Sequence, residues 1–245
     1  MAKKAVKKTK RAKKSKFKVR DIWSWRWISR FAARIALVVA AVVVVLVLLF
    51  SFVNPPTTHT IWTEGRRLGT AQQTWVDLDE IAPVMARSVV AAEDANFCLH
   101  WGLDVKAIRA ALDEGGRRGA STLSQQVAKN VFLWQGRSWT RKALETGFTL
   151  IIETIWSKRR ILEVYLNIAE MDKGVFGVHA ASKRYFGVTA DKLTAVQSAR
   201  LAAVLPDPKN RSAAKPTAKL RKRAAAILDG AATIRADGRA ACFED

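Results

Sequence analysis

An acidic residue at the end of an apolar stretch is the first candidate for chemistry in this sequence. Glu93 directly follows Val89–Ala92, and the stretch has the spacing of an amphipathic helix. The negative end of a helix and an apolar neighbourhood both disfavour a carboxylate, so we expect the pKa of Glu93 to be raised. A carboxyl group of this kind can act as a general base or acid near neutral pH. The alternative is an ordinary acid that ends a helix in a surface loop.

A second candidate is the polar segment Gly119–Asn130, which follows a glycine-rich approach. Ser121 is the predicted N-cap of a helix that runs to about Phe132. The free N–H groups and the positive dipole end at such an N-terminus suit an anion. Four side chains fall close to one face of this helix: Thr122, Gln126, Lys129 and Asn130. Ordinary capping with a solvated polar face is the alternative.

A third candidate is a pair of cations beside an acid. Arg141 and Lys142 precede Glu145, and Arg141 is spaced i,i+4 from the glutamate. Two cations near a carboxylate could grip a phosphate and serve a leaving group. The same spacing suits a plain ion pair on a helix, and the local sequence favours that simpler interpretation.

Helices must position these groups, because apolar residues from 79 onward recur at intervals of three and four. The pattern predicts helices at about residues 81–92, 105–112, 139–156, 161–168, 193–204 and 216–234. Gly174 and Gly177 suit a tight turn before a further helix. Residues 60–78 alternate weakly and contain glycines, so a short strand or hairpin is expected there. With no convincing series of strands, we predict one mainly α domain.

The 245 residues carry a formal net charge of +21, which is concentrated at the N-terminus. Residues 1–34 hold 14 Lys and Arg against one acid and are expected to form a basic cytoplasmic tail. Residues 35–53 contain no charge, Gly or Pro, which predicts a transmembrane helix of roughly 28 Å. A cleaved signal peptide is the alternative, but the apolar run is long and no clear cleavage site follows.

The flanking charges predict the orientation of this span. Basic residues precede it, whereas the first Lys or Arg after it is Arg66, so the basic side is expected to stay cytoplasmic. Trp23, Trp25 and Trp27 suit an interfacial aromatic belt. The tail would then meet anionic lipid headgroups rather than nucleic acid. After the span we expect a linker and entry segment at 54–78 and a globular domain at 79–245.

Four blocks of this sequence resemble the motifs of the peptidoglycan glycosyltransferases, glycosyltransferase family 51. The matching patterns are E-D-x-x-F-x-x-H-x-G from Glu93, G-x-S-T-x-x-Q-Q-x-x-K-N from Gly119, R-K-x-x-E from Arg141 and K-x-x-I-L-E-x-Y-L-N from Lys158. One block alone would be weak, but four in order over about residues 85–210 are specific. Ala120 and Ser124 stand where relatives often have Gly and Thr. The segment Asn167–Glu170 resembles the monofunctional members in particular.

The resemblance implies an α-rich, lysozyme-like glycosyltransferase domain on a single N-terminal transmembrane helix. In the implied reaction, lipid II is the acceptor and a growing lipid-linked glycan is the donor. The acceptor GlcNAc 4-hydroxyl attacks the donor MurNAc anomeric carbon, and undecaprenyl diphosphate leaves with inversion to a β-1,4 bond. Glu93 is expected to be the general base. Glu145 is expected to be the second carboxylate, which helps the diphosphate depart directly or through water or a metal.

Further roles follow from the same resemblance. Three cations are expected to neutralise the diphosphate as its charge grows: Lys129, Arg141 and Lys142. Polar residues of the second block are expected to position sugars and phosphates: Ser121, Thr122, Gln126 and Asn130. The rest of the first block is expected to shape the site around Glu93 rather than react: Asp94, Phe97 and His100. No cofactor is firmly implied and the histidines form no metal cluster, but a divalent cation, Mg²⁺ or Mn²⁺, at the diphosphate is left open.

The expected partners are lipid II, a lipid-linked glycan strand and membrane lipids, with division or wall-synthesis proteins as further candidates and no nucleic acid. The expected location is the bacterial inner membrane, with the N-terminus in the cytoplasm and the catalytic domain in the periplasm. Two alternatives stay open. A lysozyme-like lytic hydrolase would use Glu93 as an acid but would need no diphosphate-binding cations. An inactive membrane-anchored scaffold would not need both Glu93 and Glu145.

Two further expectations concern the surface and the cysteines. Four residues between the second and third blocks form an apolar-aromatic patch that is predicted to dip into the outer leaflet, with a buried loop as the alternative: Phe132, Leu133, Trp134 and Trp139. Cys98 and Cys242 would face an oxidising periplasm and could pair. The sequence gives no distance between them, so the pairing stays open.

Overall fold

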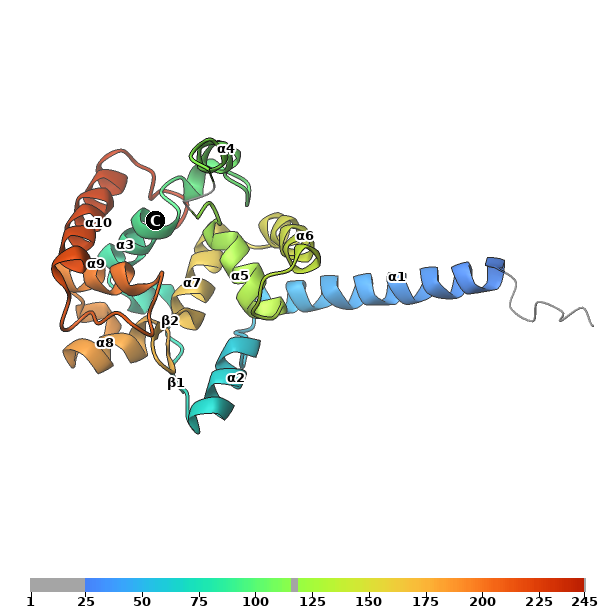
Figure 1. The fold of residues 1–245 in the computed structure, drawn as a ribbon, viewed down its shortest axis with the longest axis horizontal. Coiled ribbons are helices and arrows are strands. Elements are labelled where there is room, and N and C mark those ends of the chain that lie inside the picture. The colour runs from blue at the N-terminus through green and yellow to red at the C-terminus, as the bar shows by residue number, and fades with distance from the viewer. Residues whose placement is uncertain (1–24, 116–118, 245) are drawn as a thin grey trace, which may run out of the picture. The chain divides into compact units, whose positions relative to one another are not determined.

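The computed structural model describes residues 25–115 and 119–244 (Figure 1). Most of the predicted basic tail lies outside the described residues, and so does Trp23 of the predicted aromatic belt. The chain divides into two compact units, residues 1–43 and residues 44–245, which are described separately. The division falls within the first helix.

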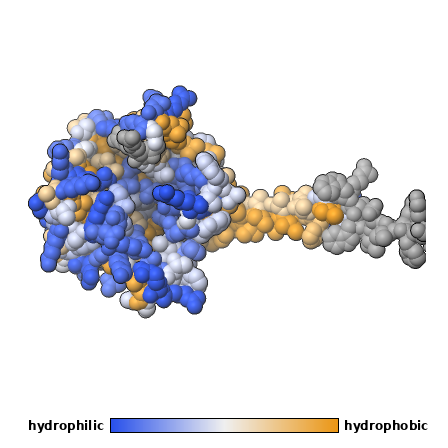
Figure 2. Space-filling model, viewed as in Figure 1, coloured by the Kyte–Doolittle hydropathy of each residue, from blue (hydrophilic) through white to orange (hydrophobic). Residues whose placement is uncertain are grey.

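Helix α1 (Trp25–Phe50) is the long apolar helix. Its segment Trp27–Phe50 has 24 residues and a mean hydropathy of 3.0, so it could cross a membrane by length and composition. Most of its side chains are exposed and apolar (Figure 2). The helix begins before the predicted start at residue 35, because the Arg and Ala residues there are good helix formers although the arginines are charged. It ends at Phe50, short of the predicted 53, just ahead of two prolines.

The larger unit is mainly α-helical, as predicted (Figure 1). Its helices are α2 (His59–Leu68), α3 (Pro83–Glu93), α4 (Val105–Asp113), α5 (Leu123–Phe132), α6 (Trp139–Ile155), α7 (Lys158–Ile168), α8 (Val178–Phe186), α9 (Ala195–Val204) and α10 (Ala218–Ala236). Short 3-10 helices are η1 (Leu78–Glu80), η2 (Phe97–Leu99) and η3 (Ala190–Lys192). The strands β1 (Gln72–Gln73), β2 (Glu170–Asp172) and β3 (Val175–Phe176) form a small sheet in the order β1-β3-β2. Strand β3 is parallel to β1 and antiparallel to β2.

The short strand expected within residues 60–78 is β1 at Gln72–Gln73, but α2 occupies the first half of that segment, where no helix was predicted. Thr58 caps the N-terminus of this helix by accepting a hydrogen bond from the N–H of Ile61 at 3.3 Å. Gly69 ends the helix with a φ of 78°, in the left-handed region that glycine adopts readily. These two caps outweigh the weak alternation on which the expectation rested.

Two groups of helices build the core. Helices α3, α9 and α10 pack together, and α5 packs against α6 and α7 (Figure 1). Gly230 of α10 permits a close approach to α3, since a Cβ at this position would lie 3.2 Å from the Cβ of Ala91. Both groups of helices contact the C-terminal end of α3. Glu93 at this end contacts Arg223 of α10 and Gln126 of α5.

The last turn of α1 belongs to the larger unit, and side chains near the junction of α6 and α7 cap it. The indole N–H of Trp156 donates to the carbonyl of Val47 at 2.8 Å. Arg160 donates to the carbonyl of Phe50 through Nε at 3.2 Å and Nη2 at 3.1 Å. The ring of Phe132 lies 6.0 Å from that of Phe50. The carbonyl of Phe50, which the helix end leaves without a backbone donor, is thereby satisfied by Arg160, and the carbonyl of Val47 accepts from Trp156 in addition to the N–H of Ser51.

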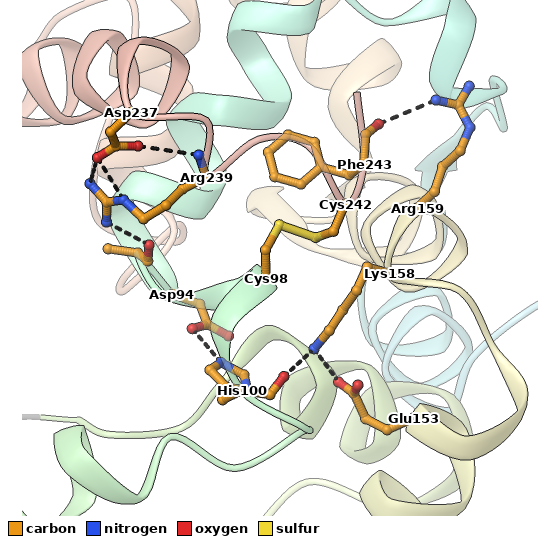
Figure 3. The surroundings of a disulfide bond; sticks show 11 residues. Asp94, Cys98, His100, Glu153, Lys158, Arg159, Asp237, Arg239, Cys242 and Phe243 are labelled. Carbon is orange, nitrogen blue, oxygen red and sulfur yellow. Dashed lines mark hydrogen bonds and ion pairs between the residues drawn. A yellow bond between two sulfur atoms is a disulfide. The ribbon is translucent and has the colours of Figure 1, made fainter. Parts of the chain in front are cut away.

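A disulfide joins Cys98 and Cys242, which resolves the pairing that the sequence leaves open (Figure 3). It connects η2, just after α3, to the C-terminal segment across a sequence separation of 144 residues. The rings of Phe97 and Phe243, each next to one of the cysteines, lie 6.4 Å apart. The C-terminal segment thus holds the loop that follows Glu93.

Replacing both cysteines by serine (C98S/C242S) is expected to lower the free energy of unfolding by about 2–4 kcal/mol, because the crosslink restricts the unfolded chain. Urea unfolding of the full chain in detergent measures the difference. A thiol titration of the denatured, unreduced wild-type protein is expected to find no free thiol. Two reactive thiols in that titration would contradict the disulfide.

Candidate active site

Glu93 is the last residue of α3, and the two oxygens of its carboxylate have different surroundings. Oε2 accepts a hydrogen bond from Nε2 of Gln126 at 3.0 Å. Oε1 is buried and, within the described residues, has no hydrogen-bond partner. The side chain is 14% exposed. One oxygen therefore fixes the carboxylate in place, and the other keeps its lone pairs without a hydrogen bond among the described residues.

Burial raises the pKa of Glu93, so the direction predicted from the sequence is confirmed. The negative charge of Asp94 adds to the rise, whereas the hydrogen bond from Gln126 and the positive charges of Arg223 and Lys129 oppose it. Removal from water disfavours the ionised form, which is the apolar-neighbourhood effect expected from the sequence. A carboxylate of this kind is a stronger base than a solvated one.

The remaining named residues of the first block, Asp94, Phe97 and His100, make internal contacts in the structure. Asp94 accepts a hydrogen bond from the backbone N–H of Leu123 at 2.9 Å, and its other oxygen lies 2.8 Å from Nε2 of His100 (Figure 3). Phe97 is fully buried, and Nζ of Lys158 lies 4.5 Å from the centroid of its ring. Asp94 thereby fastens the end of α3 to the first turn of α5.

The N-cap of α5 is Thr122, so the prediction of Ser121 at this position is wrong. The hydroxyl of Thr122 accepts from the N–H of Gln125 at 3.2 Å and donates to the carbonyl of Gly102 at 2.6 Å. The side chain of Gln125 in turn accepts from the N–H of Thr122, which completes a capping box. If Ser121 were the N-cap, the third residue after it would be Ser124. A serine there is not the Glu or Gln that a capping box requires. Thr122 is buried with its hydroxyl fully used, whereas Ser121 is exposed.

The second turn of α5 opens onto a cleft of about 510 Å³, where the predicted polar residues Gln126, Lys129 and Asn130 meet Tyr165 of α7. Tyr165 donates a hydrogen bond to Oε1 of Gln126 at 3.3 Å, which directs the amide nitrogen of Gln126 toward Glu93. Tyr165 therefore orients the amide of Gln126 from beneath the cleft.

Lys129 is a partly buried cation whose Nζ has no hydrogen-bond or ion-pair partner within the part of the chain that the structure describes. Burial lowers its pKa, and the negative charges of Glu145 and Glu93 oppose this shift. Lys129 also feels the positive charges of Arg141 and Lys142. It therefore lies within electrostatic range of both Glu93 and the ion pairs of α6, and an anion that entered here would relieve an unfavourable charge.

The third block is a charge cluster on the first turns of α6. Glu145 is 3% exposed, and its two oxygens face two different cations. Oε2 accepts from Arg141 at 2.6 Å, and Oε1 accepts from Lys142. Arg141 also donates through Nε to the carbonyl of Gly136 at 2.8 Å, and Lys142 lies 3.4 Å from the hydroxyl of Ser121. The helix ion pair that the spacing suggested is thus present, and it is buried rather than solvated.

The cluster does not fit a metal held by the protein. Within residues 25–115 and 119–244, no group of three or more His, Cys, Asp and Glu is placed to bind a metal ion. Mg²⁺ and Mn²⁺ prefer free carboxylate oxygens, and those of Glu145 are both engaged by cations. No step of the reaction is therefore assigned to a metal.

Two features of the cleft escaped the sequence analysis. Lys209 forms an ion pair with Glu64 of α2 at 2.7 Å and lies 3.5 Å from Glu170 of β2, so it joins two walls of the cleft. Arg223 of α10 reaches Glu93 at 3.8 Å. Neither cation lies in one of the four blocks, and no local pattern connects residues so distant in the sequence.

Known proteins resemble this chain over most of its length. A family model described as Transglycosylase matches residues 61–232. A protein named biosynthetic peptidoglycan transglycosylase from Jannaschia sp. (strain CCS1) is 56% identical over 197 residues, which cover 80% of this chain and 82% of the relative. Proteins of the same name are similar in Klebsiella oxytoca (50% identity, 83% and 89% covered) and in Rhodospirillum centenum (48% identity, 89% and 98% covered). The chain therefore belongs to the transglycosylase family.

Proposed function

We propose that this protein is a peptidoglycan glycosyltransferase that polymerises lipid II into β-1,4-linked glycan strands and releases undecaprenyl diphosphate. One juxtaposition carries the proposal: Glu93, a largely buried carboxylate with one oxygen outside any hydrogen bond, lies near Lys129, a partly buried cation without a partner among the described residues. The first suits removal of a proton from a sugar hydroxyl, and the second suits a diphosphate. The names of the relatives agree with this chemistry.

In this proposal, the 4-hydroxyl of the acceptor GlcNAc attacks the anomeric carbon of the donor MurNAc from the face opposite the diphosphate. The hydroxyl proton passes to the carboxylate of Glu93, the new C–O bond forms, and the old anomeric C–O bond breaks with inversion. The bonding electrons leave with undecaprenyl diphosphate. Lys129, Arg141 and Lys142 neutralise the charge that grows on this leaving group.

Glu145 acts through its neighbours in this mechanism. Its carboxylate is buried and accepts hydrogen bonds on both oxygens. It therefore holds Arg141 and Lys142 next to each other. This role is narrower than the direct assistance to the leaving group implied by the resemblance. Thr122 likewise supports the site from within, through its contact with Gly102. The sugars and phosphates are then bound by Ser121, Gln126 and Asn130. These residues line the cleft or are at least partly exposed.

The cations distinguish this function from lytic hydrolysis of the glycan strand. A hydrolase that uses two carboxylates needs the second one available as a nucleophile or base. Glu145 is not available, since Arg141 and Lys142 occupy both of its oxygens. A hydrolase also has no diphosphate to bind, so it would need no cation like Lys129, which lacks a partner among the described residues.

We assign the protein to the bacterial inner membrane, with α1 as its single span, the N-terminus in the cytoplasm and the larger unit in the periplasm. The basic residues that precede the span support this orientation. Membrane lipids are then its neighbours. We also propose division or wall-synthesis proteins as partners. An enzyme so anchored works where its lipid-linked substrate lies.

The predicted membrane patch becomes smaller in this proposal. Leu133 is buried, and the ring of Phe132 stacks on Phe148 with the centroids 5.0 Å apart, so neither side chain can dip into a leaflet. Trp134 and Trp139 are 45% and 91% exposed. These two tryptophans remain as the part of the patch that meets the bilayer, and tryptophan suits the interfacial region.

Glu93→Gln in the full chain is expected to reduce polymer formation from labelled lipid II about 10²- to 10⁴-fold, because the amide cannot take up the hydroxyl proton. Gel separation of the labelled products measures the effect, and an unchanged unfolding midpoint shows that the fold is intact. Wild-type protein that released short fragments from glycan strands instead of polymer would favour the hydrolase. Full activity of the variant would contradict the assignment of Glu93.

Trp139→Cys and Lys222→Cys test the membrane patch and the orientation with one reagent, a membrane-impermeant maleimide. The native cysteines are paired and do not react. In intact spheroplasts, Lys222→Cys is expected to be labelled, since the residue is exposed on α10. Trp139→Cys is expected to be protected in membranes and labelled in detergent. An unlabelled Lys222→Cys would contradict the orientation, and equal labelling of Trp139→Cys in both media would contradict contact with the bilayer.

A further inference from the structure

Arg223 contacts the proposed base from a helix that lies outside the four sequence blocks. Its Nη2 lies 3.8 Å from Oε1 of Glu93 and donates to the carbonyl of Ala92 at 3.4 Å. Both partners belong to the last turn of α3. A cation at a helix C-terminus is favourable, because the carbonyl groups there carry partial negative charge. Arg223 therefore meets the backbone and the side chain of the same helix end.

The packing of α10 on α3 explains how Arg223 reaches this position. Gly230 brings the two helices close together beside Ala91, and Ala224 and Ile227 are buried on the same helix. The side chain of Arg223 is 39% exposed and lines a cavity of about 430 Å³ together with Glu93 and Gln126. This cavity is a space in which a sugar hydroxyl could approach Glu93.

The geometry of the pair leaves Oε1 of Glu93 without a hydrogen bond. At 3.8 Å the two groups attract each other as charges, but the contact is too long for a hydrogen bond. Oε1 of Glu93 and Nε of Arg223 are both buried, and neither has a hydrogen-bond partner among the described residues. The cation thus favours the ionised carboxylate without occupying the lone pairs that a proton would need.

We infer that Arg223 is a positioning residue for Glu93: it holds the carboxylate ionised and in place without forming a hydrogen bond to Oε1. The inference rests on the proposed function, because it gives Glu93 the role of base. Arg223 itself takes no part in proton transfer. Its effect on the reaction passes through Glu93 alone.

The other charged and titratable groups that face Glu93 determine how the removal of Arg223 changes the pKa of Glu93. Lys129 of α5 is the second cation, Asp94 is the neighbouring acid, and Tyr165 of α7 is a buried phenol whose pKa is raised well above its ordinary value. Burial and Asp94 raise the pKa of Glu93, and Arg223 lowers it more than Lys129 does. Without Arg223 the pKa of Glu93 rises further, so a larger fraction of the base is protonated at a given pH below neutral.

The test compares the pH dependence of kcat/KM for lipid II polymerisation in the full chain. Arg223→Met is expected to move the acid limb to higher pH by about one unit, and its activity should approach that of the wild type at high pH. Arg223→Lys, which keeps the charge, is expected to restore most of the acid limb. Lys222→Met, at an exposed neighbouring position on the same helix, is the matched control and should leave the profile unchanged.

A profile of Arg223→Met that is lowered uniformly with its acid limb unmoved would overturn the inference and leave Arg223 a structural residue. A raised KM with an unmoved acid limb would also overturn it, since Arg223 would then bind substrate directly. Should Arg223→Met fail to fold, Arg223→Gln carries the same comparison. Wild-type protein that forms no polymer would instead contradict the proposed function, so the two failures are distinguishable.

Discussion

A carboxylate and an ammonium group that are largely removed from water, and that do not neutralise each other, decide how the rest of this structure is arranged. Glu93 keeps one oxygen without a hydrogen bond, and Lys129 keeps its ammonium group without a partner in the described part of the chain. Groups in this state are costly to hold away from water. They persist because the helices that carry them are fixed by many other contacts. The cost is recovered when a substrate supplies the hydroxyl and the anion that the site lacks.

The fixing contacts come from elements far apart in the sequence. Asp94 ties α3 to α5, and Asn167 of α7 exchanges hydrogen bonds with the backbone of Val76, which sets the wall behind the cleft. The disulfide of Cys98 fixes the loop after α3, and the ion pair of Glu145 fixes the first turns of α6. Most of the polar residues in the four sequence blocks therefore serve the frame, and few of them are free to touch a substrate.

The sequence predicts the fold well where the pattern is long and periodic. Helices α3, α4, α6, α7, α9 and α10 lie close to their predicted ranges, and the raised pKa of Glu93 follows from its apolar surroundings. Local chemistry misleads where two caps compete, as at Ser121 and Thr122, because the completed capping box decides between them. Contacts such as Cys98 with Cys242, or Arg223 with Glu93, depend on how helices pack and leave no local signal.

The central claim is that the cleft holds an unneutralised cation ready for a diphosphate. The most direct test is calorimetric binding of inorganic pyrophosphate to the full chain in detergent, compared with Lys129→Met and with Lys219→Met, which changes an exposed lysine on α10. The account predicts that Lys129→Met weakens binding roughly 10- to 100-fold, the size of one charged hydrogen bond, and that Lys219→Met binds as the wild type does. Equal affinity of Lys129→Met and the wild type would contradict it.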